Sequence, residues 1–199
     1  MAFLTSEQLK SMNFKSMGDH IYISDKASIY NPSKISLGSY VRIDDFAIIS
    51  AGEEGIEIGN FVHIACYACM LGHSKITFHD FTGISLRSMV LSSTSDFTGD
   101  HLFNLKEFTP LNEIEGLTIS INKPVVFEKV SVLGAGSIVM PGVTLASNSG
   151  VGALSMILKD TEPGGFYWGN PARLVRQATT KAFNLLEESF KNGLIKIRA

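Results

Sequence analysis

The sequence predicts an all-β fold, a parallel β-helix in which the chain coils into a stack of short strands. Three observations lead to this prediction. Apolar residues recur at every sixth position along most of the chain, and small or β-branched residues form a second row four places after them. Both rows stay regular except where the phase slips by two or three residues. A period of six suits a three-sided coil with one short strand on each side.

The first row supplies the expected core. One inward side chain on each side of every turn would fill the axis of the coil. Neither the period of a strand nor that of a helix gives this spacing. The row consists of Leu37, Ile43, Ile49, Ile58, Ile64, Met70, Phe78, Ile84, Val90, Phe127, Leu133, Val139, Leu145, Val151 and Ile157.

The second row marks the corners of the coil, where only a small side chain fits. Its members are Ala27, Ser33, Val41, Ala47, Val62, Ala68, Thr82, Ser88, Ser131, Ser137, Val143, Ser149 and Ser155, with Glu53 as an exception at a coil boundary. Each phase slip places an aliphatic residue two positions before the inward one. We interpret these residues, Ile35, Ile56, Ile76 and Val125, as the marks of a wider corner.

One long segment, residues 92–123, shows no sustained period and is interpreted as a loop inserted at a corner. A coil tolerates such an insertion because each turn contacts only its neighbours. A long excursion from a regular scaffold is usually functional.

The two ends of the chain favour helices. Residues 6–14 predict a short helix that caps the first turn. Residues 177–192 place Phe183, Leu186 and Phe190 on one apolar helical stripe. Both helices would cover open strand edges. We therefore expect a β-helix domain over 1–176, with its N-terminal cap and its loop, followed by a C-terminal helix within 177–199.

Composition narrows the functional classes. The 199 residues carry a net charge of −2, so no basic field indicates a nucleic-acid partner. No apolar stretch is long enough for a membrane span, and the first residues do not resemble a signal peptide. Cys66 and Cys69 have CxxC spacing but lie among the hexads, which favours two small apolar residues over zinc or redox chemistry. We expect a cytoplasmic protein without a metal.

The last coils carry a family resemblance. Residues 132–177 contain "GAGS", "PGV", "VGA", "KD" and "GNPAR" in this order. This stretch resembles the hexapeptide-repeat acyltransferases, which are left-handed parallel β-helix enzymes. The resemblance implies the left hand, acyl-CoA as cosubstrate, and a homotrimer whose active sites lie between subunits.

A closer resemblance links the chain to the nucleotide-sugar N-acyltransferases of amino-dideoxy sugar pathways, such as anthrose biosynthesis. It is carried by "KASIYNP" (26–32), "VRIDDF" (41–46), "ISLRS" (84–88) and "SDFTGD" (95–100). It implies transfer of an acyl group to the amine of a nucleotide-linked amino sugar for cell-surface polysaccharide, such as lipopolysaccharide. Two alternatives stay open: a sugar O-acetyltransferase, and a β-helix scaffold without catalysis.

The start of the loop is the expected catalytic position. Many related sugar acyltransferases place a histidine there as general base, whereas residues 90–96 contain Ser95 and Asp96 and no histidine. A sugar hydroxyl needs a base to become a nucleophile, but a neutral amine needs only orientation and a late proton acceptor. The pattern therefore favours N-acylation, in which Asp96 accepts the proton that leaves the amine. Ordinary turn chemistry explains Ser95 and Asp96 equally well.

The histidines are rivals for this role. His73 is expected one turn beneath Ser93, about 5 Å along the axis, where it would reach the same pocket or lie at the surface of a widened corner. His101, in the loop, would enter a neighbour's site or be exposed. His63 and His79 occupy outward positions, which indicates solvent or a subunit interface.

The acidic pair in "RIDDF" has two readings. We expect Asp44 and Asp45 in a solvated outward corner, although the resemblance allows them a contact with nucleotide or sugar.

Acyl-CoA needs backbone partners for its amides and cations for its phosphates. Gly134, Gly136, Gly152 and Ala153 would leave backbone groups reachable, or would simply satisfy tight corners. The cations Lys159, Arg173 and Arg176 would bind the phosphates, or form a solvated face. Tyr167 and Trp168 would either pack over the last coil, which we favour, or form a surface that faces the adenine.

Overall fold

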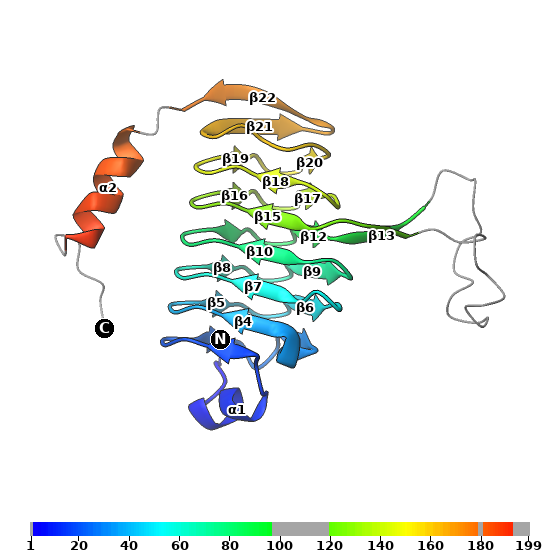
Figure 1. Ribbon diagram of the computed structural model, residues 1–199, viewed down its shortest axis with the longest axis vertical. Coiled ribbons are helices and arrows are strands. Elements are labelled where there is room, and N and C mark those ends of the chain that lie inside the picture. Colours follow the sequence, from blue (N-terminus) through cyan, green and yellow to red (C-terminus); the bar gives the residue numbers. More distant parts are fainter. Residues whose placement is uncertain (1, 97–119, 179–180, 193–199) are drawn as a thin grey trace.

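The computed structural model describes residues 2–96, 120–178 and 181–192 and shows a parallel β-helix (Figure 1). Three sheets run along its length as the sides of a prism. Two of them, sheets 1 and 3, contain six strands each, and sheet 2 contains eight because two further strands extend it at the C-terminal end. Strands of successive turns pair in parallel, so each turn lies directly on the one before it. The predicted fold is confirmed.

The strands follow the hexads closely. Sheet 1 consists of β1 (Ser16–Met17), β4 (Ile35–Leu37), β7 (Ile56–Ile58), β10 (Ile76–Phe78), β15 (Val125–Phe127) and β18 (Thr144–Leu145). Sheet 2 consists of β2 (Tyr22–Ile23), β5 (Arg42–Ile43), β8 (His63–Ile64), β11 (Gly83–Ile84), β16 (Val132–Leu133), β19 (Gly150–Val151), β21 (Gly165–Gly169) and β22 (Ala172–Gln177). Sheet 3 consists of β3 (Ser28–Tyr30), β6 (Ile48–Ala51), β9 (Cys69–Gly72), β12 (Met89–Leu91), β17 (Ile138–Val139) and β20 (Met156–Ile157).

The predicted first row fills the axis. Each of its members, from Leu37 to Ile157, is at most 4% exposed. Burying an aliphatic or aromatic side chain of this size contributes about 1.5–3 kcal/mol. The four aliphatic residues at the phase slips are buried as well. They lie in the three-residue strands of sheet 1, so at these turns sheet 1 points two side chains inward.

The second row lies at the corners and is buried, with two exceptions. Ala27 is half-buried, and Ser33 is exposed. Ser33 departs from the prediction because it lies in the one-turn 3₁₀ helix η1 (Pro32–Lys34), which widens the corner after β3. Buried hydroxyls in this row bridge adjacent turns: Ser88 Oγ donates to the Gly134 carbonyl, and Ser137 Oγ to the Gly152 carbonyl, both at 2.8 Å.

Aromatic ladders line two corners. At the corner between sheets 1 and 2, His20, Tyr40, Phe61 and Phe81 all have φ between 56° and 60°. Positive φ is uncommon outside glycine and is needed here to turn the chain tightly. Neighbouring rings of this ladder stack with centroids 4.6–4.9 Å apart.

The outward faces of the three sheets differ in chemistry. Sheet 1 is largely polar, with Ser16, Ser36, Glu57, Thr77, Val126 and Thr144 in one row. Sheet 3 has two outward rows over β6 to β20, and both are apolar except for Ser50. One row contains Ile48, Cys69, Met89, Ile138 and Met156, and the other contains Ser50, Leu71 and Leu91. Sheet 2 is mixed, with Tyr22, Arg42, His63, Gly83, Val132 and Gly150 in its outward row.

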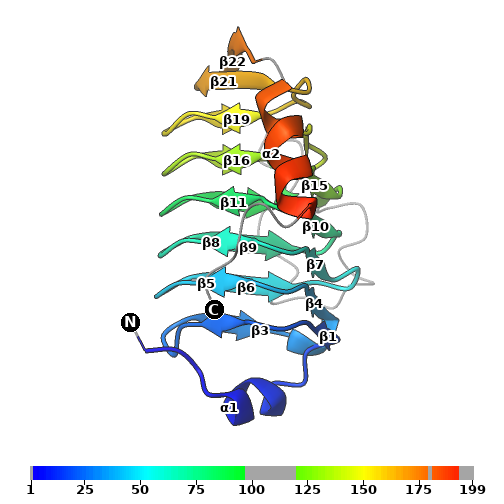
Figure 2. The ribbon, with the colours of Figure 1, turned by 90° about the vertical axis from the view of Figure 1, so that its left-hand side faces the viewer.

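A helix forms near each end of the chain, as predicted, but only α1 covers an open end of the coil (Figure 1). Helix α1 (Ser6–Ser11) begins at a capping box, in which Thr5 Oγ1 accepts a hydrogen bond from the Gln8 amide, and it buries Leu9 against the first turn. Helix α2 (Lys181–Lys191) runs along the side of the β-helix (Figures 1 and 2). Glu187 of α2 pairs with Lys129. No helix among the described residues is long and apolar enough to cross a membrane.

Helix α2 corrects one expectation. The outward hexad positions of Phe61, Tyr67 and Phe81 predict rings that have no cover within the chain. Instead, the ring of Phe190 packs edge-on against both, with centroid distances of 5.3 and 5.6 Å. Tyr67 does remain 54% exposed, and it stacks on Phe46.

Candidate functional site

The inserted loop leaves the β-helix at the corner between sheets 3 and 1. It begins and ends as an antiparallel hairpin, β13 (Ser93–Ser95) and β14 (Ser120–Asn122), which projects on the side opposite to α2 (Figure 1). The root of the hairpin is fixed at Ser92. Its buried hydroxyl donates to the Ser74 carbonyl at 2.6 Å, and its own carbonyl accepts from the Lys123 amide at 3.0 Å. The first residues of the loop therefore start from a rigid position.

Two of the predicted catalytic candidates lie on the outgoing side of this hairpin, and a third lies at the corner from which the hairpin leaves. Ser95 ends β13 and is exposed, and Asp96 follows it and is half-buried. His73 is exposed and lies one turn below: a Cβ on the preceding residue, Gly72, would come within 2.7 Å of the Ser93 amide nitrogen. The fourth candidate, His101, lies outside the described residues.

A pocket at the C-terminal end of the β-helix brings together two of the predicted phosphate ligands. Lys159 and Arg173 both line this pocket of about 380 Å³, with Tyr167 and Leu174 as apolar walls. Arg176 lies in the same strand, β22, opposite Phe166, and is not among the lining residues. Lys159 follows β20, so it lies at the same corner of the prism as the root of the hairpin.

The predicted glycines lie at a different corner, between sheets 2 and 3, and the stacking of turns explains two of them. A Cβ on Gly134 would lie 2.5 Å from the Val151 carbonyl oxygen and 2.7 Å from the Ala153 amide nitrogen. A Cβ on Gly152 would lie 2.9 Å from the Trp168 ring, which is itself 55% exposed. Gly136 has φ +67°, a conformation that favours glycine.

A larger groove, of about 500 Å³, lies on the outward face of sheet 2. Phe61 and Phe81 form one end, Ser85 and Leu86 the other, and His63 lies between them. Gly83 of β11 opens the groove, because the paired positions of the adjacent strands carry His63 and Val132. The groove is mostly apolar and offers few polar groups.

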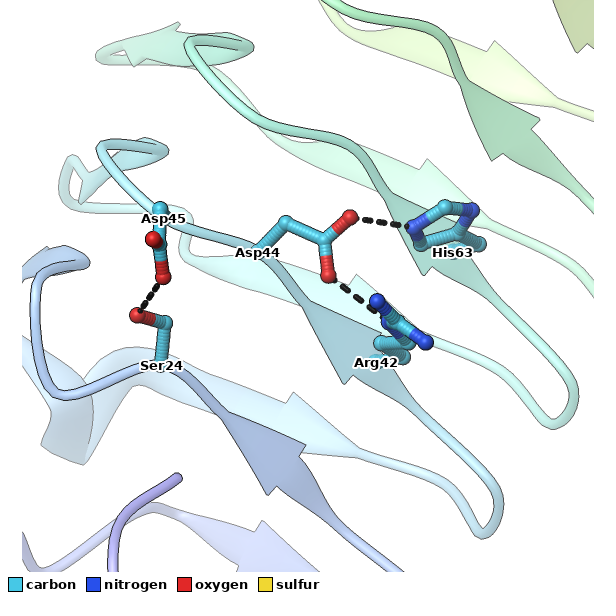
Figure 3. Close-up of polar contacts among 5 residues, drawn as sticks. All are labelled: Ser24, Arg42, Asp44, Asp45 and His63. Atoms are coloured by element: carbon cyan, nitrogen blue, oxygen red, sulfur yellow. Dashed lines mark hydrogen bonds and ion pairs between the residues drawn. The ribbon is translucent and has the colours of Figure 1, made fainter. Parts of the chain in front are cut away.

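A buried carboxylate holds His63 at the edge of this groove. Asp44 Oδ2 lies 2.8 Å from His63 Nε2, and Asp44 Oδ1 accepts from Arg42 Nε at 2.7 Å (Figure 3). Asp44 is only 6% exposed, which corrects the expectation of a solvated corner. Burial raises the pKa of the Asp44 carboxyl, but the hydrogen bonds from Arg42 and His63 outweigh this effect and leave that pKa below its ordinary value of 3.8.

Asp45 faces away from the groove and has a structural contact. Its carboxylate accepts from Ser24 Oγ at 2.5 Å and pairs with Lys26 at 3.4 Å (Figure 3). The hydrogen bond from Ser24 lowers the pKa of the Asp45 carboxyl. Asp44 therefore contacts the following turn and Asp45 the preceding turn, although the two residues are adjacent in the sequence.

Cys66 and Cys69 are free thiols, and burial raises the pKa of the Cys69 thiol. A thiol with a raised pKa is a poorer nucleophile at neutral pH. Within the described ranges, no three His, Cys, Asp or Glu side chains come together to hold a metal ion.

Comparisons with known proteins give a clear relationship. The chain is 40% identical over 195 residues, 98% of each chain, to the dTDP-4-amino-4,6-dideoxy-D-glucose acyltransferase of Escherichia coli. It belongs to the nucleotide-sugar N-acyltransferases of the hexapeptide-repeat family. No model of a protein family matches the sequence.

Solved structures of the family agree. AntD, an N-acyltransferase from Bacillus cereus, in complex with dTDP and 3-hydroxybutyryl-CoA, superimposes with a TM-score of 0.87 at 34% identity, over 97% of this chain and 98% of AntD. A further AntD structure holds dTDP-4-amino-4,6-dideoxyglucose and coenzyme A, and also has a TM-score of 0.87. The β-helix of this acyltransferase is accordingly left-handed. A galactoside acetyltransferase in complex with coenzyme A shares the fold alone, with a TM-score of 0.54 and 16% identity over 89% of this chain and 71% of that enzyme.

Sequence reasoning missed the Asp44–His63 contact. The two residues are 19 positions apart, two fewer than the 21 positions that separate Arg42 from its partner His63 in the next turn. A count along the coil would have placed Arg42 and His63 at equivalent positions of adjacent turns, because β5 and β8 pair in this register. The hexads therefore contain the information that brings these side chains together, but the phase slips obscure the register between adjacent turns.

Proposed function

We propose that the protein transfers an acyl group from acyl-CoA to the amine of a dTDP-linked 4-amino-4,6-dideoxyhexose. The observation that supports this most is the relationship to the E. coli acyltransferase, which spans 98% of both chains. The AntD complexes with dTDP-4-amino-4,6-dideoxyglucose and with 3-hydroxybutyryl-CoA support both the acceptor and the donor class.

We assign the proton acceptor to Asp96, with Ser95 and His73 at the same corner. The neutral sugar amine attacks the thioester carbonyl carbon and forms a tetrahedral intermediate. The C–S bond then breaks, the CoA thiolate leaves, and the amine proton passes to the Asp96 carboxylate as the amide forms. Orientation of the amine and proton transfer both raise the rate of the reaction, and proton transfer alone contributes about 10²–10⁴-fold. The described part of residues 90–96 offers no imidazole for activation of a hydroxyl, which favours the amine.

The donor would enter at the C-terminal pocket. Lys159 and Arg173 pair with CoA phosphates there, and Arg176 contacts a phosphate at the edge of the pocket. The pocket belongs to the last turn, two turns above the hairpin, which is about 10 Å at the spacing of β-strands. An extended pantetheine arm covers this distance and would carry the thioester to Asp96. Gly134, Gly136, Gly152 and Ala153 lie at the corner between sheets 2 and 3, so in this proposal their backbone groups contact the amides of an arm that is bound to a neighbouring subunit.

We also propose that the enzyme is a homotrimer with active sites between subunits. The polar face of sheet 1 suits solvent, whereas the apolar face of sheet 3 suits a protein partner. The corner between sheets 2 and 3 adds a line of exposed apolar side chains, namely Phe46, Tyr67, Leu86 and Leu154. Three copies that meet with this corner at a threefold axis would bury it, and sheet 3 of each copy would face sheet 2 of the next. Such a contact joins two different surfaces and closes a ring of three.

The expected location is the cytoplasm, because acyl-CoA and nucleotide sugars are supplied there. The acylated sugar would be incorporated into a cell-surface polysaccharide such as lipopolysaccharide.

A thiol-release assay tests the proposal. Purified protein is incubated with acetyl-CoA or 3-hydroxybutyryl-CoA and each member of a panel of dTDP- and UDP-linked amino sugars. We expect thiol release that depends on a dTDP-linked 4-amino sugar and is absent with the corresponding 4-hydroxy sugar. Equal release with the hydroxy sugar would favour O-acylation instead, and release with neither sugar would contradict the proposal.

A further inference from the structure

An apolar row on the outward face of sheet 3 connects the C-terminal pocket with the root of the hairpin. It runs beside the corner between sheets 3 and 1, and the register of the parallel strands places one member in each turn. From the C-terminal end, the row contains Leu158, Met140, Leu91 and Leu71. Leu158 lines the same pocket as Lys159 and Arg173. The row therefore begins at the cations that are assigned to the CoA phosphates.

The row passes the hairpin and continues one turn beyond it. Leu91 directly precedes Ser92, the residue that fixes the hairpin root. Leu91 pairs with Leu71 of the preceding turn, and Leu71 pairs with Ser50. Tyr30 comes next and is 56% exposed. The apolar surface thus extends one strand spacing past the hairpin, about 4.8 Å, and then ends at two residues that carry hydroxyl groups.

This row gives a bound acyl-CoA a direction. When the phosphates lie at Lys159 and Arg173, the pantetheine arm runs along the row, and the thioester reaches the height of the hairpin that carries Asp96. The acyl chain follows the thioester carbonyl, so it continues in the same direction, and the next apolar surface that it meets is Leu71.

We infer that Leu71 forms the floor of the site for the acyl chain and sets a preference for short acyl chains over acetyl. This inference rests on the proposed function, because it requires acyl-CoA as the donor. Leu71 is half-buried, so one side of its side chain is available to a ligand.

The end of the apolar row limits the length of chain that gains from it. An extended acyl chain advances about 1.3 Å per bond, so one strand spacing takes up about four bonds from the carbonyl carbon. A chain of about five carbons reaches Leu71, and further carbons lie over Ser50. Complete burial of one methylene contributes about fourfold, and a floor covers only one side of the chain. We expect kcat/KM to rise about two- to fourfold per carbon from acetyl-CoA to pentanoyl-CoA and then to level off.

Replacement of Leu71 by serine tests the floor. Initial rates with acetyl-CoA and with butyryl-CoA, at saturating dTDP-4-amino-4,6-dideoxyglucose, give kcat/KM for each donor. Wild type should prefer butyryl-CoA about 4- to 16-fold, and Leu71→Ser should reduce this preference to less than about twofold while kcat/KM for acetyl-CoA stays nearly unchanged. The ratio of the two values does not depend on the amount of folded enzyme, so a loss of stability does not disguise the result.

Ile48→Ser is the matched control. Ile48 lies in the other outward row of sheet 3, where it pairs with Cys69, and it is 39% exposed. The same change at this position removes an aliphatic side chain from the same sheet and should leave the preference for butyryl-CoA intact. An equal loss of preference in both variants would indicate a general effect on the face of sheet 3 and would overturn the assignment to Leu71.

Replacement of Ser50 by leucine tests the length limit by a gain of activity. Ser50→Leu extends the apolar row by one turn, so the rise in kcat/KM should continue past pentanoyl-CoA. The variant should use octanoyl-CoA better than wild type does, by about tenfold, and should use acetyl-CoA as wild type does. An unchanged profile in Ser50→Leu would show that the chain does not run along this row.

The contradicting outcomes are distinct. Equal kcat/KM for acetyl-CoA and butyryl-CoA in wild type would overturn the inference, and so would a Leu71→Ser variant that keeps the wild-type preference. If wild type releases no thiol from any of these donors with any dTDP-linked amino sugar, the proposed function is wrong. That result is separable, because the inference concerns only the ratio between donors.

Discussion

Replacement of Arg173 by alanine tests the position of the CoA phosphates. Arg173 and Lys159 line the same pocket at the end of the β-helix, and the guanidinium matches phosphate oxygens in a bidentate arrangement. A hydrogen bond to a charged group contributes about 1.5–3 kcal/mol. Because Arg173 is exposed, solvent screens part of this interaction. We therefore expect the substitution to reduce the binding free energy of acyl-CoA by about 1.5–2 kcal/mol. This corresponds to an increase of about 10- to 30-fold in KM for acyl-CoA.

The turnover number should stay nearly unchanged. Phosphate binding is remote from the thioester and is equal in the ground state and the transition state, so its loss raises KM without lowering kcat. Initial rates at varied acyl-CoA and saturating acceptor measure both constants. The difference between variant and wild type should shrink as ionic strength rises, because salt screens exposed charges. Lys10→Ala removes an exposed cation from α1, at the opposite end of the β-helix, and should leave KM unchanged.

A second substrate sharpens the test. With 3′-dephospho-CoA, which has one phosphate fewer, the effect of Arg173→Ala should be smaller if Arg173 contacts that phosphate. A large loss of kcat with unchanged KM would refute the assignment of Arg173 to the phosphate site.

Three further predictions follow from the same structure. Asp96→Asn should lower kcat by about 10²–10⁴-fold, and His73→Asn should lower kcat less. Steady-state kinetics that show the reverse order would contradict the amine mechanism. Met89→Asp on the apolar face of sheet 3 should prevent trimer formation in light scattering, whereas Thr77→Asp on sheet 1 should not; a trimeric Met89→Asp variant would exclude sheet 3 as the interface. Because the pKa of Asp44 is lowered in the folded state, its contribution to stability is present above the ordinary value of 3.8 and is lost as pH falls through the folded-state pKa. The difference in unfolding free energy between wild type and Asp44→Asn should therefore shrink as the pH falls below 3.8, and a difference that grows over this acid range would contradict this sign.

The core of the fold could be predicted from the sequence because the period of six has one physical cause. Each inward position, such as Ile64 or Leu133, repeats the same environment in every turn, so the pattern alone identifies it. The phase slips were also informative, since Ile76 and Val125 are buried in sheet 1 as the wider corners require.

Contacts between turns were harder to predict. Asp44 and His63 are joined only by the register of β5 and β8, which depends on the exact width of each corner. The cover of Phe61 and Phe81 by Phe190 depends on where α2 lies after β22, which no local pattern determines. The position of His73 one turn beneath Ser93, by contrast, could be predicted, because the two residues are equivalent in the hexads of adjacent turns.

The most direct test of the central claim is the chemical nature of the product. Wild-type enzyme is incubated with dTDP-4-amino-4,6-dideoxyglucose and isotopically labelled acetyl-CoA, and the purified product is treated with hydroxylamine at mildly alkaline pH before mass spectrometry. An amide at C4 survives this treatment, whereas a sugar ester is cleaved. The account predicts one labelled acetyl group per sugar that is retained after treatment. A label that is lost on treatment would show an ester, and would contradict transfer to the amine.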